Sequence, residues 1–276
     1  MVFNRWRNRD VMAGTIVSRA VSDLYRGLTS WRIWWLLGIS DIRQRYSRSR
    51  FGQFWITFSM AIFIVSISVV FALLFGQSVR EYMPYLAVNY VVWMLMSGII
   101  TDSTTVFCHS ENFLRQEALP RSIFVMRILV RNVTIFAHNI VIVPLVLLAT
   151  GNWPNWAWLL LPIGLALILT AGFFAALLIG VLCTRFRDLP QIVQNVMQIA
   201  FFITPVMWPA SQLRVQMPEI IDYNPFAAFL HVAADPLRGI VPSAWSYMLV
   251  CVSIAILAAM SLPLFARFRA RIVYWL

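Results

Sequence analysis

Lysine is absent from this chain, and all 22 of its basic residues are arginine. A Walker A loop places a lysine on the β- and γ-phosphates of ATP, and Schiff-base catalysis needs a lysine amine. The absence therefore excludes a P-loop ATPase site and Schiff-base chemistry in these 276 residues.

Cysteine and charge are also scarce. Cys108, Cys183 and Cys251 each fall in or beside an apolar run without a near partner, so neither a disulfide framework nor a metal cluster is indicated, and we interpret them as small core residues. Charged residues make up 12% of the chain, whereas hydrophobic residues make up 61%. No soluble domain of this size needs that much apolar surface, so the composition predicts a polytopic helical membrane protein.

The formal net charge of +11 raises nucleic acid as an alternative partner. The arginines, however, cluster at the ends of apolar runs, as the cytoplasmic face of a membrane protein requires. We therefore expect membrane lipids and no nucleic acid among the partners.

The apolar runs predict six transmembrane helices, because a spanning helix needs roughly 20 apolar residues. The predicted fold is an all-α integral membrane protein with a cytoplasmic N-terminal part (1–50), which carries an amphipathic interface helix, and a six-span domain (51–276). The predicted spans are 52–76, 84–107, 124–149, 157–184, 189–209 and 244–266, with a tight turn at 150–155.

Residues 211–239 interrupt this pattern between the fifth and sixth spans. The run from Pro225 to Ala234 is free of acidic and basic residues, with His231 counted as neutral, but it is too short to cross. We expect short re-entrant helices at the outer membrane face, which survive only where protein or a water-filled cavity covers them. A cavity there suggests an outer gate.

The arginine distribution predicts the orientation. Nineteen arginines fall in the segments that would lie inside, and three fall outside, namely Arg80, Arg214 and Arg238. The positive-inside rule therefore places both termini in the cytoplasm.

The N-terminal part contains a helical pattern from Ser22 to Tyr46, whose uncharged core is too short to cross. Its tryptophans, Trp31 and Trp35 among them, suit a helix lying in the cytoplasmic interface. A basic patch with Arg43, Arg45 and Arg48 follows. Attraction to anionic lipid headgroups is one interpretation of this patch, and a rim that receives an anionic substrate headgroup is the other.

A short segment of mixed character, residues 109–117, follows the second span and ends before Pro120. It suits an exposed helix presented to a partner, although a solvated turn is the alternative.

Several aromatic residues recur at helical spacing: Phe51, Trp55 and Phe58 in the first span, and Phe201, Phe202 and Trp208, more loosely, in the fifth. Such faces suit the apolar C–H faces of sugar rings, and packing against lipid or helices is the alternative. The sequence contains no His-Glu-x-x-His motif, no Gly-x-Ser-x-Gly motif and no clustered carboxylate dyad, so we expect transport, with no catalytic and no metal-binding residues.

Five segments carry a resemblance to the permeases of polysaccharide-exporting ABC transporters. Asp41 to Ser49, Phe51 to Trp55, Arg185 to Leu189, Thr204 to Val206 and Tyr223 to Pro225 are similar to that family, within a match that runs from about residue 23 to the end. The chain most resembles the Wzm-type O-antigen permeases, with capsule and teichoic acid permeases as near relatives.

The resemblance implies a bacterial inner-membrane homodimer that pairs with two copies of a separate P-loop ATPase, where ATP and Mg bind, and moves lipid-linked polysaccharide from cytoplasm to periplasm. The coupling helix would contain Glu111, Asn112, Phe113, Leu114 and Arg115. Substrate would enter beside Trp31, Trp35, Arg43, Arg45, Tyr46 and Arg48. The outer gate would contain Asp222, Tyr223, Asn224, Pro225, Asp235 and Arg238.

Two other classes stay open. One is an ABC permease for a capsule or teichoic acid polymer, or for a small lipid or drug. The other is a membrane-embedded glycan-modifying enzyme, for which Asp222 and Asp235 are the acidic pair available besides Glu219.

Overall fold

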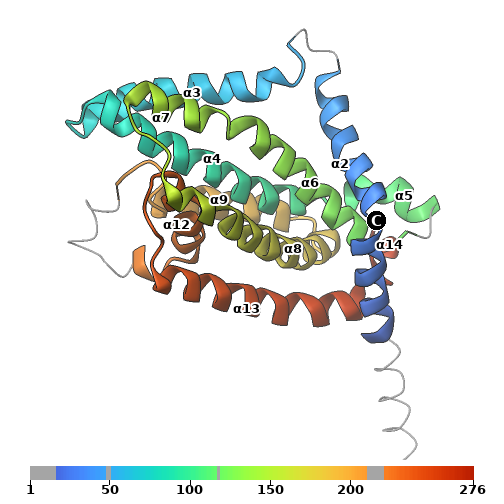
Figure 1. Ribbon diagram of the computed structural model, residues 1–276. Helices are drawn as coiled ribbons and strands as arrows, with labels where there is room; N and C mark the ends of the chain where they lie inside the picture. The colour runs from blue at the N-terminus through green and yellow to red at the C-terminus, as the bar shows by residue number, and fades with distance from the viewer. Residues whose placement is uncertain (1–16, 48–50, 117–118, 210–220) are drawn as a thin grey trace, which may run out of the picture.

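The computed structural model describes residues 17–47, 51–116, 119–209 and 221–276, which form helices and no strands. Five helical segments in these residues are long and apolar enough to cross a membrane. They are α3 (Phe54–Leu74), α4 (Val79–Ser103), α6 with α7 (Ser122–Thr150), η2 with α8 (Trp156–Arg185) and α13 (Ala244–Phe268). Figure 1 shows that α2 (Trp31–Tyr46) runs across one end of this bundle, whereas α12 (Pro225–Leu237) lies at the other. The all-helical fold is confirmed for the described residues, with five segments that could span a membrane.

The remaining predicted span is shorter than expected. Helix α9 (Leu189–Ile203) has 15 residues and ends before Thr204, not at residue 209. At 1.5 Å per residue it is about 22 Å long, less than the roughly 30 Å of a bilayer core. The following residue, Pro205, has no N–H with which to continue the helical ladder. A sixth helical span is therefore not confirmed.

Helix α4 begins five residues before the predicted start. The Ser78 hydroxyl accepts a hydrogen bond from the Glu81 N–H, and the Glu81 carboxylate accepts one from the Ser78 N–H. This capping box satisfies two backbone donors at the helix start and places Glu81 in the first turn of α4.

The third span is divided into α6 (Ser122–Asn139) and α7 (Ile142–Thr150). Pro144 cannot donate to the carbonyl of Ile140, which accepts from the Val143 N–H at 3.0 Å instead. The predicted turn after α7 is confirmed: Gly151 closes the helix with a φ of 84° in the left-handed region.

The expected single helix from Ser22 to Tyr46 is wrong. Residues 17–29 and α2 are separate helices that meet at Ser30. The hydroxyls of Thr29 and Ser30 both donate to the carbonyl of Arg26, and such bonds compete with the helical ladder and bend the chain.

Helix α12 is buried along its length and packs against α4, α8 and α13. Its N-cap, Asn224, accepts hydrogen bonds from the N–H groups of Phe226 and Ala227, and Pro225 occupies the first turn. Gly164 of α8 lets the two helices approach closely, because a Cβ at this position would collide with the carbonyl of Val232.

Gly164→Leu is expected to lower the thermal unfolding midpoint of the detergent-solubilised protein by several degrees, because overpacking a tight contact costs about 1–3 kcal/mol. Ala166→Leu, on an exposed position of the same helix, is the matched control and should leave the midpoint unchanged. Equal midpoints for the two variants would contradict the close packing of α12 on α8.

Candidate functional site

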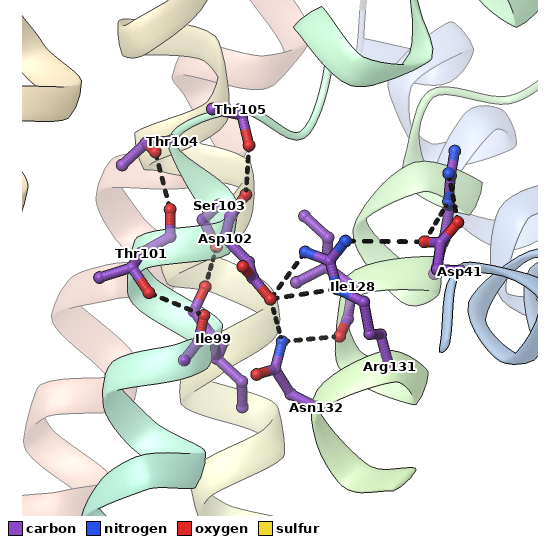
Figure 2. Close-up of polar contacts among 12 residues, drawn as sticks. Asp41, Ile99, Thr101, Asp102, Ser103, Thr104, Thr105, Ile128, Arg131 and Asn132 are labelled. Atoms are coloured by element: carbon purple, nitrogen blue, oxygen red, sulfur yellow. Dashed lines mark hydrogen bonds and ion pairs between the residues drawn. The ribbon is translucent and has the colours of Figure 1, made fainter. Parts of the chain in front are cut away.

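Asp41, Asp102, Arg127, Arg131 and Asn132 form a polar cluster, the α2–α6 cluster, where α2, α4 and α6 meet (Figure 2). The guanidinium of Arg127 holds Asp41 with two bonds, Nε to Oδ2 at 2.8 Å and Nη2 to Oδ1 at 2.6 Å. Arg131 lies 2.7 Å from Asp102 Oδ2 through its Nη2 and 3.7 Å from Asp41 Oδ2 through its Nη1. Asn132 donates to the same Asp102 oxygen at 2.7 Å. The cluster therefore joins three helices through charged groups.

The Asp41–Arg127 pair is nearly enclosed, since the two side chains are 13% and 16% exposed. Such charges are tolerated away from water only when each is paired and hydrogen-bonded. Gly38 allows this approach, because a Cβ there would press against Val130 and the Arg127 carbonyl of α6. The close contact of α2 with α6 at Gly38 therefore brings Asp41 within reach of Arg127.

A second carboxylate attaches the first described helix. Asp23 lies 3.0 Å from Arg269 at the end of α13 and accepts from the backbone N–H groups of Arg121 and Ser122 at the start of α6. Its side chain is 3% exposed. The two helices before the first span are thus each fixed to the bundle by one buried aspartate.

The residues expected where substrate enters lie on α2 and face outward. Trp31, Trp35, Arg43 and Arg45 are exposed, and none of them lines the cavities of about 400, 490 and 110 Å³ in the described part of the chain. The side chain of Tyr46 and all of Arg48 lie outside the described residues.

The segment expected to couple to an ATPase forms a short 3₁₀ turn, η1 (Cys108–Ser110), followed by α5 (Glu111–Gln116). Leu114 is buried, whereas Phe113 is 41% exposed, and the side chains of Asn112 and Arg115 lie outside the description. The segment is therefore a helix and not a solvated turn.

The start of α5 adjoins the α2–α6 cluster. Arg127 Nη1 lies 3.5 Å from the hydroxyl of Ser110, and both residues line a cavity of about 110 Å³ with Asp41 and Asp102. In η1, desolvation raises the pKa of the Cys108 thiol and the Glu111 carboxylate raises it further, so this thiol is a poor nucleophile at neutral pH.

The aromatic residues expected along a transport path fall into two groups. Phe51, in the turn before α3, forms an exposed row with Trp55 and Phe58 of α3, with successive ring centroids 6.1 and 5.7 Å apart; this row is called the α3 row. On α9, Phe201 packs against Trp93 and Tyr90, while Phe202 is 65% exposed. Trp208 donates its indole N–H to the carbonyl of Phe202 at 2.9 Å. Among the described residues, no ring contact joins the α3 row to the α9 group.

After α9 the backbone is non-helical, and side chains of α4 bond to its carbonyls. The Tyr85 hydroxyl lies 2.6 Å from the Pro205 carbonyl and 2.7 Å from the Trp208 carbonyl, which share its one proton. Asn89 donates to Pro205 at 3.3 Å, and Tyr82 donates to Met207. Irregular backbone buried in a membrane protein needs such partners, because water does not reach it. The sequence showed no sign of these pairs, which are separated by more than 110 residues.

The residues expected to form an outer gate occupy both ends of α12. At its start, Asn224 donates to the Thr204 hydroxyl at 3.2 Å, so two of the resembling segments are in contact. Asp222 accepts the Trp245 indole N–H at its carbonyl, and Tyr223 packs edge-on against that indole. Asp222, Tyr223, Trp245 and His231 line a cavity of about 400 Å³.

At the other end of α12, Asp235 lies 2.9 Å from His231 Nδ1 and 3.3 Å from Arg238 Nη1. The Arg238 guanidinium also lies over the ring of Tyr85, 4.8 Å from its centroid. This chain of contacts connects the end of α12 to the side chain that binds the backbone after α9. Asp222 and Asp235 stand at opposite ends of a 13-residue helix and form no catalytic dyad.

Comparisons with known proteins fit this arrangement. Residues 33–235 match the family of ABC-2 type transporters. An O-antigen export system permease protein RfbA of Myxococcus xanthus is 22% identical over 192 residues, which are 69% of this chain and 74% of that protein. Two proteins of the same name from Klebsiella pneumoniae are 23% and 24% identical over 194 residues, with the same shares covered. The match to the family model extends over more than half of the chain, from α2 through α12, and the chain belongs to the ABC-2 type transporter family.

Proposed function

We propose that the chain is the membrane-spanning subunit of an ATP-driven exporter that carries lipid-linked polysaccharide of the O-antigen type from cytoplasm to periplasm. The family match carries this proposal, because it includes α2, α5 and α12, the three elements that an exporter needs at its two faces. The names of the curated relatives support the polysaccharide cargo.

A separate P-loop ATPase, with ATP and Mg, supplies the energy and docks on α5. The exposed ring of Phe113 offers an aromatic anchor for it, while Leu114 holds the helix to the bundle. Two permease copies and two ATPase copies make up the complex. A second copy completes the path, since the cavity of about 490 Å³ between α4, α8, α9 and α13 is lined almost wholly by apolar side chains, which do not suit a hydroxyl-rich polymer.

Both termini lie in the bacterial cytoplasm, and the chain crosses the inner membrane six times. The short helix α9 completes its crossing with the non-helical residues 204–209, which Tyr82, Tyr85 and Asn89 satisfy. Helix α12 is the re-entrant element of the outer gate, and the Asp235–Arg238–Tyr85 contacts hold it against the end of that crossing.

Lipid-linked substrate enters beside α2, whose exposed Trp31 and Trp35 suit the headgroup depth of a bilayer. Arg43 and Arg45 attract anionic headgroups there. The exposed row of Phe51, Trp55 and Phe58 offers ring faces to sugars. Capsule or teichoic acid polymers would use the same surfaces. A small lipid or drug would need no such row.

Affinity purification of the chain from its native membrane is expected to recover a P-loop ATPase in equal amount. Phe113→Asp should lower the recovered ATPase about tenfold or more, because an aromatic anchor at an interface contributes about 2 kcal/mol. Trp153→Asp is the matched control, since Trp153 is 80% exposed in the turn that follows α7, and Figure 1 shows α7 and α5 at opposite ends of the bundle. Absence of any co-purified ATPase would contradict the proposed class, and equal recovery with both variants would contradict docking on α5.

Asp41→Asn and Arg127→Met are each expected to destabilise the purified protein by about 3–5 kcal/mol, because each strands a nearly buried charge. The double variant should recover part of this loss, since it removes both charges together. Arg26→Met, at an exposed position, is the control for the removal of an arginine. The midpoint of thermal unfolding is the measurement, and strictly additive losses would show that the two side chains do not act as a pair.

A further inference from the structure

Helix α9 carries four exposed amide side chains on an otherwise apolar helix: Gln191, Gln194, Asn195 and Gln198, here called the amide stripe. Their spacing of three and four residues places them on one face. Gln191 donates to Asn195 at 3.1 Å, which is the one side-chain hydrogen bond within the stripe that the described residues show.

The other faces of α9 are apolar. Met197 and Ala200 are buried against the bundle, while Ile192, Val196 and Ile199 form a third face, which is exposed. The helix therefore separates its amides from its aliphatic side chains instead of mixing them.

The stripe lies at membrane depth. Val193 and Met197, from the same turns of α9, line a cavity of about 490 Å³ together with Met96 and Ile99 of the spanning helix α4. The same cavity also contacts the spanning helices α8 and α13. Unpaired amides at this depth are strongly unfavourable against hydrocarbon, because lipid tails offer them no hydrogen-bond partner. We therefore infer that the stripe does not face lipid.

The stripe continues into an aromatic side chain. Phe202 follows Gln198 by four residues, lies on the same face and is 65% exposed. Amides donate to and accept from hydroxyl groups, and an aromatic ring packs on the C–H face of a sugar. A face with both suits a polymer of sugars surrounded by water.

We propose that the amide stripe of α9 lines the water-filled export conduit and hydrogen-bonds the hydroxyl groups of the passing glycan. The glycan part rests on the proposed function, whereas the water-filled conduit does not. Exchangeable, weak contacts of this kind allow a polymer to slide, since tight binding would stop it.

Thiol accessibility tests the conduit in the assembled complex with its ATPase. The three native cysteines are replaced by alanine, and single cysteines are introduced at Gln194 and Gln198, with Ile192 and Ile199 as matched controls on the aliphatic face. A membrane-impermeant maleimide is expected to label positions 194 and 198 about tenfold faster than the controls, since the thiolate reacts where water reaches it. Slow labelling at all four positions, or rapid disulfide formation between two copies at 194, would overturn the proposal by showing a packed helix interface.

A pair of leucines tests the contact with glycan in the native-cysteine chain. The double variant Gln194→Leu with Gln198→Leu should reduce surface polysaccharide about tenfold. The double variant Gln194→Asn with Gln198→Asn, which keeps the amides, should retain export. Equal ATPase recovery from both pairs verifies that each complex has assembled. Fast labelling of the stripe with unchanged export from the leucine pair would overturn the glycan contact. If the whole chain proved dispensable for surface glycan, the proposed function would fail while the labelling result still decided the conduit.

Discussion

A carboxylate or a non-helical carbonyl that is buried away from water needs a partner in the protein, and the rest of this structure depends on that constraint. The carboxylate of Asp41 is covered by Arg127 on another helix, and that of Asp235 by His231 and Arg238 on its own. The carbonyl of Pro205, freed where α9 ends, is covered by Tyr85 and Asn89. The Asp41 and Pro205 contacts therefore join elements that are far apart in sequence, whereas those of Asp235 are local.

These contacts divide the molecule into two ends with different roles. At the end where α2 crosses the bundle, the α2–α6 cluster ties the α2 helix to α4 and α6 and touches Ser110, which leads into α5. Under the proposed function, a movement of the ATPase at α5 would reach the helix that receives substrate through these charged contacts. At the other end, Arg238 and Tyr85 link α12 to the backbone after α9, so under the proposed function the outer gate and the end of the conduit would move together.

Hydropathy predicted α3, α8 and α13 closely, because long apolar runs have few alternatives in a membrane. It misplaced boundaries that local hydrogen bonds decide: the capping box of Ser78 starts α4 early, and Pro205 stops α9 early. Asn224 and Thr204 were singled out as parts of separate segments, and only the fold shows that they touch. The Asp41–Arg127 pair is separated by 86 residues, so no periodicity in the sequence indicates it. Amide spacing on α9 was visible in the sequence, but its significance depends on which face of α9 is buried.

The most direct test of the central claim is the amount of surface polysaccharide after the chain is depleted from its native cell. An exporter predicts loss of surface glycan and accumulation of lipid-linked glycan at the cytoplasmic face of the membrane, both reversed when the chain is restored. Unchanged surface glycan, with no accumulated lipid-linked precursor, would contradict the account.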